Sequence, residues 1–328
     1  MKTMSIKTYA RAIRDVLAEE MRRDERVFIM GEDVEKQGGI FGCTRDLYQE
    51  FGVERVRNTP ISEAGIIGAG LGAACTGMRP VVELMYMDFT LVAMDQIINQ
   101  VAKTRFIFGG KTRIPLVIRG QQGIGRGNAA THSQSLETIF MHIPGIKVAC
   151  PSSPEDAAGL LRTAIRDDNP VIFFEHKALY SKKGDVPDDP EFTIPFGKAA
   201  ILREGSDVTI VGNLLYADRA MEAASVLEGA GVSAEVIDPR TLVPFDIDTI
   251  VGSVRKTGRL VVVHEAHRTA GWGAEIVSEV VGQAFTCLVA PPQRLGAAAC
   301  PLPFNLGLEA AAVPGVQDIV DAAMAVCR

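Results

Sequence analysis

The chain is poor in positive charge, in aromatic side chains and in paired cysteines. Its formal net charge of −6 over 328 residues argues against nucleic acid or an anionic membrane as a partner. Aromatic residues make up only 6% of the chain, whereas glycine is abundant, which favours layered α/β packing with close backbone contacts. The six cysteines are scattered without metal-type spacing, so we interpret them as buried thiols of a reducing cytoplasm.

Long apolar runs and several catalytic signatures are also missing. No apolar run reaches the ~18 residues that would suggest a membrane span, and the N-terminus shows no signal-peptide pattern, so we expect a cytoplasmic protein. The sequence contains no nucleophilic-serine elbow, Walker loop or zinc spacing. Gly123–Gly127 follows a strand, but its spacing does not fit a dinucleotide fingerprint, which disfavours a nicotinamide-dependent oxidoreductase.

Strands that alternate with helices predict two domains, each with a mostly parallel sheet covered by helices. We place the first domain at residues 1–182, a linker rich in Pro, Asp, Gly and Lys at 183–200, and the second domain at 201–328. A long helix is expected from Leu91 to Phe106, with Leu91, Met94, Ile98 and Val101 on its buried stripe and a stop at Gly109.

The segment from Thr59 to Ala74 organises the first domain. Ser62 is expected to cap a helix, and Glu63 follows in the first turn, where a carboxylate suits the helix dipole. Gly65, Gly68, Gly70 and Gly72 follow within the same helix, each at a cost of about 0.5–1 kcal/mol against alanine. Two interpretations remain open: a tight packing contact with Glu63 as an ordinary first-turn acid, or a carboxylate poised for acid/base chemistry.

Two further positions are candidates for chemistry. The glycine-rich loop after the strand Pro115–Arg119 delivers His132 into a polar Ser-Gln-Ser run, which suggests a proton donor or acceptor as much as a structural histidine. Phe89 is on pattern alone more often a core residue. His264 and His267 flank Glu265, but further ligands for a metal are lacking, so we favour interface polar groups there.

Several motifs together resemble the β subunit of thiamine-diphosphate-dependent 2-oxo acid and acetoin dehydrogenases, over essentially the whole chain. They are Phe28–Val34, Thr59–Glu63, Met87–Phe89, Asp95–Gln100, His132–Ser135, Ile165–Pro170 and Glu235–Thr241. The resemblance implies a transketolase-like fold, with a pyrimidine-binding domain followed by a transketolase C-terminal-type domain.

The resemblance also implies roles for individual residues. Glu63 would bond the pyrimidine nitrogen of thiamine diphosphate, Phe89 would stack on the pyrimidine, Ile61 would contact the cofactor, and His132 would face the substrate and the lipoyl group. A structural potassium ion would be bound by the residues that match the site of relatives, with an ordinary helix-to-strand turn as the alternative. These residues are Leu116, Ala164, Ile165, Asp167 and Asn169.

One family pattern is absent, because the chain has no Gly-Asp-Gly with a downstream asparagine to hold magnesium and the cofactor diphosphate. The resemblance therefore implies a separate α subunit that supplies the magnesium site, in a heterotetramer of two α and two β chains bound to a dihydrolipoyl acyltransferase core. The runs Glu175–Ser181 and Ala297–Phe304 resemble the acetoin dehydrogenase branch. We expect cleavage of acetoin with acetyl transfer to lipoyl groups; the alternatives are a pyruvate or branched-chain 2-oxo acid dehydrogenase and a non-catalytic anchoring subunit.

Overall fold

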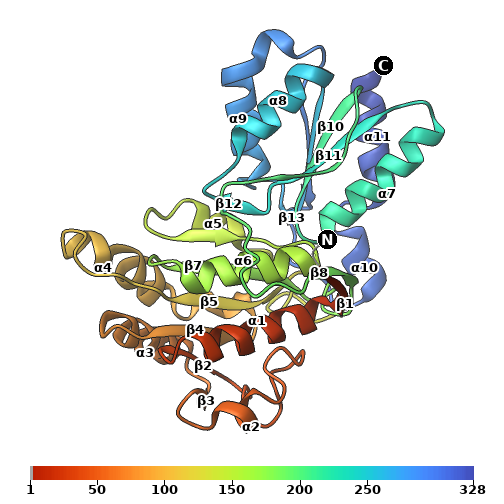
Figure 1. The fold of residues 1–328 in the computed structure, drawn as a ribbon. Helices are drawn as coiled ribbons and strands as arrows, with labels where there is room; N and C mark the ends of the chain where they lie inside the picture. Colours follow the sequence, from red (N-terminus) through yellow and green to blue (C-terminus); the bar gives the residue numbers. More distant parts are fainter. Residues whose placement is uncertain (1–2) are drawn as a thin grey trace. The chain divides into compact units, whose positions relative to one another are not determined.

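The computed structural model describes residues 3–328, which form two compact units (Figure 1). The first unit comprises the chain up to Gln122 together with Ile139–Phe196, and the second comprises Gly123–Thr138 together with Gly197–Arg328. Both units combine a largely parallel sheet with flanking helices, as expected from the alternation of strands and helices.

The sheet of the first unit has its strands in the order β6-β7-β5-β4-β2-β3, and each of these neighbouring pairs is parallel. Every residue of β2, β5 and β7 is buried, as in central strands covered on both faces. The strands span Val27–Gly31 (β2), Val56–Asn58 (β3), Arg79–Leu84 (β4), Val117–Gln122 (β5), Lys147–Ala149 (β6) and Val171–His176 (β7).

Helices α1 and α6 pack against one another, and α3 packs on β4. The side chain of Thr8 caps α1 by accepting from the backbone N–H of Arg11, and Ser153 caps α6 in the same way through Asp156. Both helices are amphipathic, so the capping residue and the apolar stripe agree on where each begins. The helices span Tyr9–Arg23 (α1), Leu47–Phe51 (α2), Glu63–Cys75 (α3), Ala102–Ile107 (α4), Glu137–Met141 (α5) and Pro154–Arg166 (α6).

The long helix expected at 91–106 is wrong in its geometry. The segment consists of the 3₁₀ helix η1 (Met87–Leu91), the π-helical turn η2 (Gln96–Val101) and the short helix α4. The wider π turn changes which residues face inward. Ala93, Ile97 and Val101 are fully buried, whereas Leu91 is exposed, so only Val101 of the expected stripe is a core residue. Gly109 has a positive φ just beyond α4, consistent with the expected stop.

The structure differs from the expected linker at 183–200, because residues up to Phe196 belong to the first unit. Lys183–Pro187 forms strand β8, which pairs antiparallel with β1 (Met4–Thr8). We call the following residues, Asp188–Phe196, the strap. Its Ile194 is buried, and the Ile194 carbonyl accepts from Thr163 Oγ1 on α6 at 2.8 Å. The strap has no regular apolar pattern, so its attachment to the first unit could not be predicted from the sequence.

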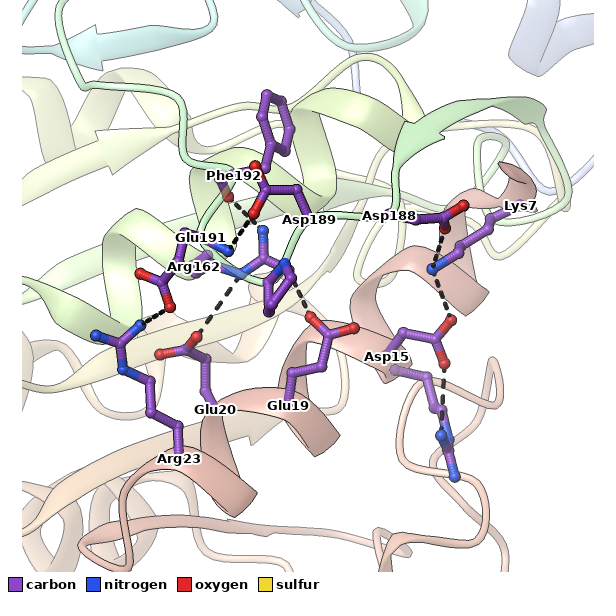
Figure 2. Close-up of polar contacts among 12 residues, drawn as sticks. Lys7, Asp15, Glu19, Glu20, Arg23, Arg162, Asp188, Asp189, Glu191 and Phe192 are labelled. Carbon is purple, nitrogen blue, oxygen red and sulfur yellow. Dashed lines mark hydrogen bonds and ion pairs between the residues drawn. The ribbon is translucent and has the colours of Figure 1, made fainter. Parts of the chain in front are cut away.

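Charged side chains fasten the strap to α1 and α6 (Figure 2). Glu191 of the strap accepts from Arg23 on α1 at 2.6 Å and from Arg166 on α6 at 2.9 Å. Arg162 donates to Glu19 at 2.6 Å and also to the strap carbonyl of Phe192. The nearly buried guanidinium of Arg162 thus joins three segments, and this makes it a stronger restraint than an isolated exposed ion pair.

The second unit contains a five-stranded sheet in the order β14-β13-β10-β11-β9, parallel except for β9. Helices α7 and α11 pack together against it, as do α8 and α9, which lie on the opposite face (Figure 1). The strands of this sheet span Ala200–Arg203 (β9), Val208–Gly212 (β10), Ala234–Asp238 (β11), Leu260–His267 (β13) and Gln293–Ala297 (β14), and the short strand Thr241–Val243 (β12) lies outside it. The helices span Leu215–Gly229 (α7), Ile247–Thr257 (α8), Gly273–Ala284 (α9), Phe285–Cys287 (η3, 3₁₀), Leu306–Ala311 (α10) and Val316–Cys327 (α11).

One segment, Leu306–Cys327, is long and apolar enough to cross a membrane by length and composition alone, contrary to the expectation that no such run exists. It comprises two helices, α10 and α11. Ile319, Val320 and Ala323 of α11 are buried in the core against α7 and the sheet, so the apolar character of α11 is explained by core packing. All six cysteines are free thiols, in agreement with the absence of paired spacing, although Cys75 and Cys300 are exposed rather than buried.

Candidate active site

The candidate site of the first unit lies at the carboxyl edge of its sheet, where the ends of β3, β2 and β4 meet. Glu63 follows β3, Glu32 directly follows β2, and Phe89 lies in η1 after β4. Because these strands are neighbours and parallel, their carboxyl ends reach the same edge. Such an edge is the usual position of ligand sites in parallel α/β sheets.

Helix α3 places Glu63 in its first turn, as the sequence predicted. Ser62 occupies the N-cap position, but its side chain makes no capping hydrogen bond, so that part of the prediction is wrong. A Cβ on Gly70 would lie 2.9 Å from Val82 and 3.1 Å from Leu116, which explains this glycine by close packing on the sheet. A Cβ added at Gly68 or Gly72 would meet no other atom within 4 Å, so both glycines face open space.

Glu63 is buried, with only 6% of its surface exposed. Burial raises the pKa of the neighbouring Glu32, and the negative charge of Glu63 raises it further. Oε1 of Glu32 is buried without a partner among the described residues. Unpartnered buried carboxylates are costly. A ligand that brings a ring nitrogen or an N–H group to these two neighbouring acids would supply the missing partner, so the residues present fit the pyrimidine of thiamine diphosphate.

Apolar surface for a planar ring is available in the same unit. Phe89 is half-buried, and Ile61, just before Glu63, has 81% of its surface exposed. Tyr86, which precedes η1, has a φ of 95°, a conformation that non-glycine residues rarely adopt and that recurs at functional sites. Lys177 lies 5.4 Å from the Tyr86 ring and thereby contributes to the support of this turn.

His132 lies on the loop Gly123–Thr138, which belongs to the second unit although it follows β5 of the first. Two buried carboxylates anchor this loop. Glu265, at the end of β13, accepts from the backbone N–H of Ile124 at 2.8 Å and from Ser135 Oγ at 3.0 Å, while Glu309 of α10 accepts from the N–H of Gly125 at 3.0 Å. These anchors hold the loop on both sides of His132.

The glycines of this loop are required by its backbone geometry. Gly123, Gly125 and Gly127 all have positive φ, and a Cβ on Gly127 would lie 2.7 Å from the carbonyl oxygen of Phe304. The half-buried His132 accepts or shares a hydrogen bond at Nδ1 with Thr131 Oγ1 at 3.0 Å. The loop that carries His132 therefore has a defined conformation. Glu265 supports this loop rather than forming part of a metal site.

A buried ion cluster of three residues, Arg119, Glu83 and Glu175, lies on adjacent strands in the first unit. Arg119 binds Glu175 through two bonds of 2.6 and 2.7 Å and also pairs with Glu83. Burial raises the pKa of Glu83, with the Arg119 charge opposing that shift. Tyr180 donates to Glu175 at 2.6 Å and stacks on Phe41, so the cluster also supports the loop between β2 and α2.

The residues expected at a potassium site gather at the turn between α6 and β7 and at the start of β5. They are Leu116, Ala164, Ile165, Asp167 and Asn169. Arg79 already donates to the carbonyl oxygens of Ile165 at 2.9 Å and Asp167 at 2.7 Å. Each carbonyl retains a second lone pair. Among residues 3–328 no cluster of three or more His, Cys, Asp or Glu side chains is suited to a metal, so a potassium ion would depend on backbone oxygens and stays a prediction.

Sequence reasoning identified Glu63, Phe89, Ile61 and His132, and the structure brings the first three to one unit and His132 to the other. It missed Glu265 and Glu309 as supports of the His132 loop, and it missed the cluster around Arg119. A buried strand that contains an arginine, such as β5, was the signal available for the cluster, because a fully buried arginine requires acidic partners.

Comparison with known proteins agrees with this architecture. Residues 6–183 match the family "Transketolase, pyrimidine binding domain", and residues 197–319 match "Transketolase, C-terminal domain". A solved structure described as a split gene transketolase, an inactive β4 tetramer, superposes with a TM-score of 0.77 at 22% identity over 97% of both chains, which supports the fold.

Two curated relatives align over nearly the whole chain. The pyruvate dehydrogenase E1 component subunit beta of Rickettsia felis is 47% identical over 98% of both chains. The acetoin:2,6-dichlorophenolindophenol oxidoreductase subunit beta of Cupriavidus necator is 47% identical over 95% of both chains. The chain therefore belongs to the family of β subunits of thiamine-diphosphate-dependent 2-oxo acid and acetoin dehydrogenases.

Proposed function

We propose that this chain is the β subunit of an acetoin dehydrogenase and contributes Glu63 and His132 to a thiamine-dependent site. The observation that carries the catalytic assignment is a pair of buried acids at one sheet edge. Glu63 begins α3 with 6% of its surface exposed, and Oε1 of the neighbouring Glu32 is buried without a hydrogen-bond partner among the described residues. A degenerate anchoring subunit would not need to keep both acids there, because an unpartnered buried carboxylate oxygen lowers stability.

Thiamine diphosphate, when bound, supplies a carbanion that attacks the substrate carbonyl. The role of Glu63 is to hold a proton at the pyrimidine ring nitrogen and thereby favour the imino tautomer. Phe89 and Ile61 provide the apolar surface that orients the ring and excludes water. His132 donates or accepts a proton at the substrate oxygen, and Glu265 and Glu309 fix the loop that presents it.

We propose further that an α subunit supplies magnesium and the diphosphate-binding residues, because the Gly-Asp-Gly pattern is absent here. The two chains would form a heterotetramer whose acyl product passes to lipoyl groups of a dihydrolipoyl acyltransferase core. A magnesium-bound diphosphate carries several charges that require oxygen ligands and cations. Half a site can bind such a group only weakly.

The acetoin assignment is supported by the run Ala297–Phe304 and by its position in the second unit. His267 Nδ1 lies 2.7 Å from the Ala298 carbonyl, and Ala297 and Leu302 share an apolar cluster with Ile124. The run therefore contacts the loop that carries His132. It lies closer to the proposed acid/base residue than the sequence suggested. Pyruvate is the main alternative, since relatives of both names are equally similar to the chain.

Reconstitution with the α subunit tests the substrate. We expect the complex to reduce a dye with a higher kcat/KM for acetoin than for pyruvate or branched 2-oxo acids, and we expect the isolated chain to turn over none of them. Titration calorimetry of thiamine diphosphate with and without α measures the shared site. A preference for pyruvate would overturn the acetoin assignment alone, whereas tight cofactor binding by the isolated chain would contradict the shared site.

Replacement of His132 by alanine tests the loop. We expect acetyl transfer to an isolated lipoyl domain to fall on the order of 10²-fold, because a positioned acid/base group is lost, while the melting temperature changes little. His142→Ala is the control, since His142 is an exposed histidine outside the loop that carries His132. Equal transfer rates for His132→Ala and the control would assign the loop a structural role.

A further inference from the structure

A basic pocket lies at the amino edge of the first unit's sheet, the edge opposite to that of Glu63. Its cavity of about 330 Å³ is lined by four cationic side chains, those of Arg26, Arg79, Lys111 and Arg113. Arg26 immediately precedes β2, and Arg79 is the first residue of β4. Since Val27 and Arg79 are paired in these parallel strands, both arginines mark the beginning of the strands, and the pocket is separate from the candidate active site.

Two carboxylates serve these four cations. Asp24 binds Arg26 at 2.7 Å, and Asp168 lies 3.3 Å from both Arg79 and Arg113. Lys111 is exposed and has no ionic partner among residues 3–328. The pocket therefore keeps an excess of positive charge, in a chain whose formal net charge is −6.

Arg79 is held in place by several hydrogen bonds, and exposed basic side chains surround it in the pocket. Only 11% of the Arg79 side chain is exposed, and its guanidinium is fixed by the carbonyls of Ile165 and Asp167 together with Asp168. Three of its five N–H donors are thereby occupied, and the others remain for a ligand. Arg113 and Lys111 are exposed long side chains that can turn onto a bound group.

The carbonyl end of α3 also reaches this pocket, and its partial negative charge would oppose an anion. The carbonyl oxygens of Gly72, Ala73 and Ala74 already accept hydrogen bonds from the backbone N–H groups of the following turn. Ala74 and Gly77 line the cavity with small residues, and a Cβ added at Gly77 would meet no other atom within 4 Å. The end of α3 thus leaves space beside the cations, and few of its carbonyl oxygens remain free to repel an anion.

We propose that this pocket binds a small anion of the phosphate class, either inorganic phosphate or the phosphate group of a nucleotide. The cavity volume falls in the lower part of the range of about 300–1,000 Å³ that is typical of small-molecule sites. A guanidinium group can donate two hydrogen bonds at once to two oxygens of a phosphate. Chloride is a single atom and cannot accept in this bidentate way. Because the pocket lies at the opposite edge of the sheet from Glu63, the anion does not compete with the thiamine site.

Cys75 supplies a probe, because it is exposed and lines the pocket. The full chain is alkylated with iodoacetamide, and peptides are quantified by mass spectrometry with phosphate, ADP or chloride at matched ionic strength. At ten times the dissociation constant we expect phosphate or ADP to slow alkylation of Cys75 by about tenfold. Chloride should not slow it, and the exposed Cys300 of the second unit should react equally throughout. The more effective of phosphate and ADP identifies the source of the group.

Lys111→Ala is expected to raise the anion concentration for half-protection by about tenfold, since one charge-assisted bond is lost. Lys183→Ala is the matched control, an exposed lysine of the same unit outside the pocket. Protection that is equal in chloride, unchanged in Lys111→Ala, or absent with both phosphate and ADP would overturn the proposal. Loss of Cys75 reactivity on addition of the α subunit alone would instead show a subunit interface, and would also overturn it.

Discussion

Replacing Glu63 with glutamine is expected to lower thiamine-dependent turnover of the reconstituted complex by on the order of 10²–10⁴-fold. The amide has the same shape as the carboxylate but cannot exchange the proton that the pyrimidine nitrogen requires. Because the two side chains are equal in size, the buried position should keep its packing. Dye reduction measures turnover, and circular dichroism verifies the fold.

The control for this variant is Glu54→Gln, which removes an equal charge from a residue whose side chain is 83% exposed. Turnover of the control should match that of the unaltered complex. Calorimetry with thiamine diphosphate separates loss of chemistry from loss of binding, because the glutamine variant should still bind the cofactor. Near-normal turnover of Glu63→Gln would remove this carboxylate from the mechanism.

Arg119→Met is expected to destabilise the chain by about 3–5 kcal/mol, the range observed when one partner of a buried ion cluster is removed. The substitution leaves Glu83 and Glu175 buried on either side of an apolar side chain of similar length. Their mutual repulsion and desolvation would no longer be offset. A lower urea midpoint of unfolding, measured on the purified complex, is the expected result.

Adding Glu83→Gln to Arg119→Met should recover part of the lost stability, since one of the two orphaned charges is removed. Arg57→Met serves as the control, because Arg57 makes an exposed pair with Glu54 and should change stability by less than about 1 kcal/mol. If Arg119→Met and Arg57→Met unfolded at the same urea concentration, the buried cluster would not contribute to stability as argued.

Local signals were sufficient to predict α1 and α6. In each, a capping side chain, an apolar stripe and a basic last turn all indicate the same helix, and the structure has both elements. The strands of both sheets are likewise short apolar runs between turn residues. At Glu63 the local residues left two interpretations open, because an acid in the first turn suits the helix dipole whereas the glycines that follow cost helix stability; the role proposed for Glu63 comes from the resemblance to the family.

Contacts between distant residues could not be predicted. Ile124 and Glu265 are 141 positions apart, and Gly125 and Glu309 are 184 apart, so no periodicity relates them. The strap has few apolar residues, and its attachment depends on charges of α1 and α6 that look like ordinary solvated faces in the sequence. The π turn in η2 was missed because an apolar pattern of helical period does not distinguish a turn of wider pitch.

The assignment of Gly123–Thr138 to the second unit means that the chain passes between the units three times, near residues 122, 138 and 196. Neither unit is therefore a continuous gene segment. A fragment ending at the strap would carry the His132 loop without Glu265 and Glu309, and its Gly125 N–H would lose its acceptor. Splitting or recombining the gene at the apparent domain boundary would thus separate the His132 loop from its supports, so a recombined protein has to inherit both units from the same parent.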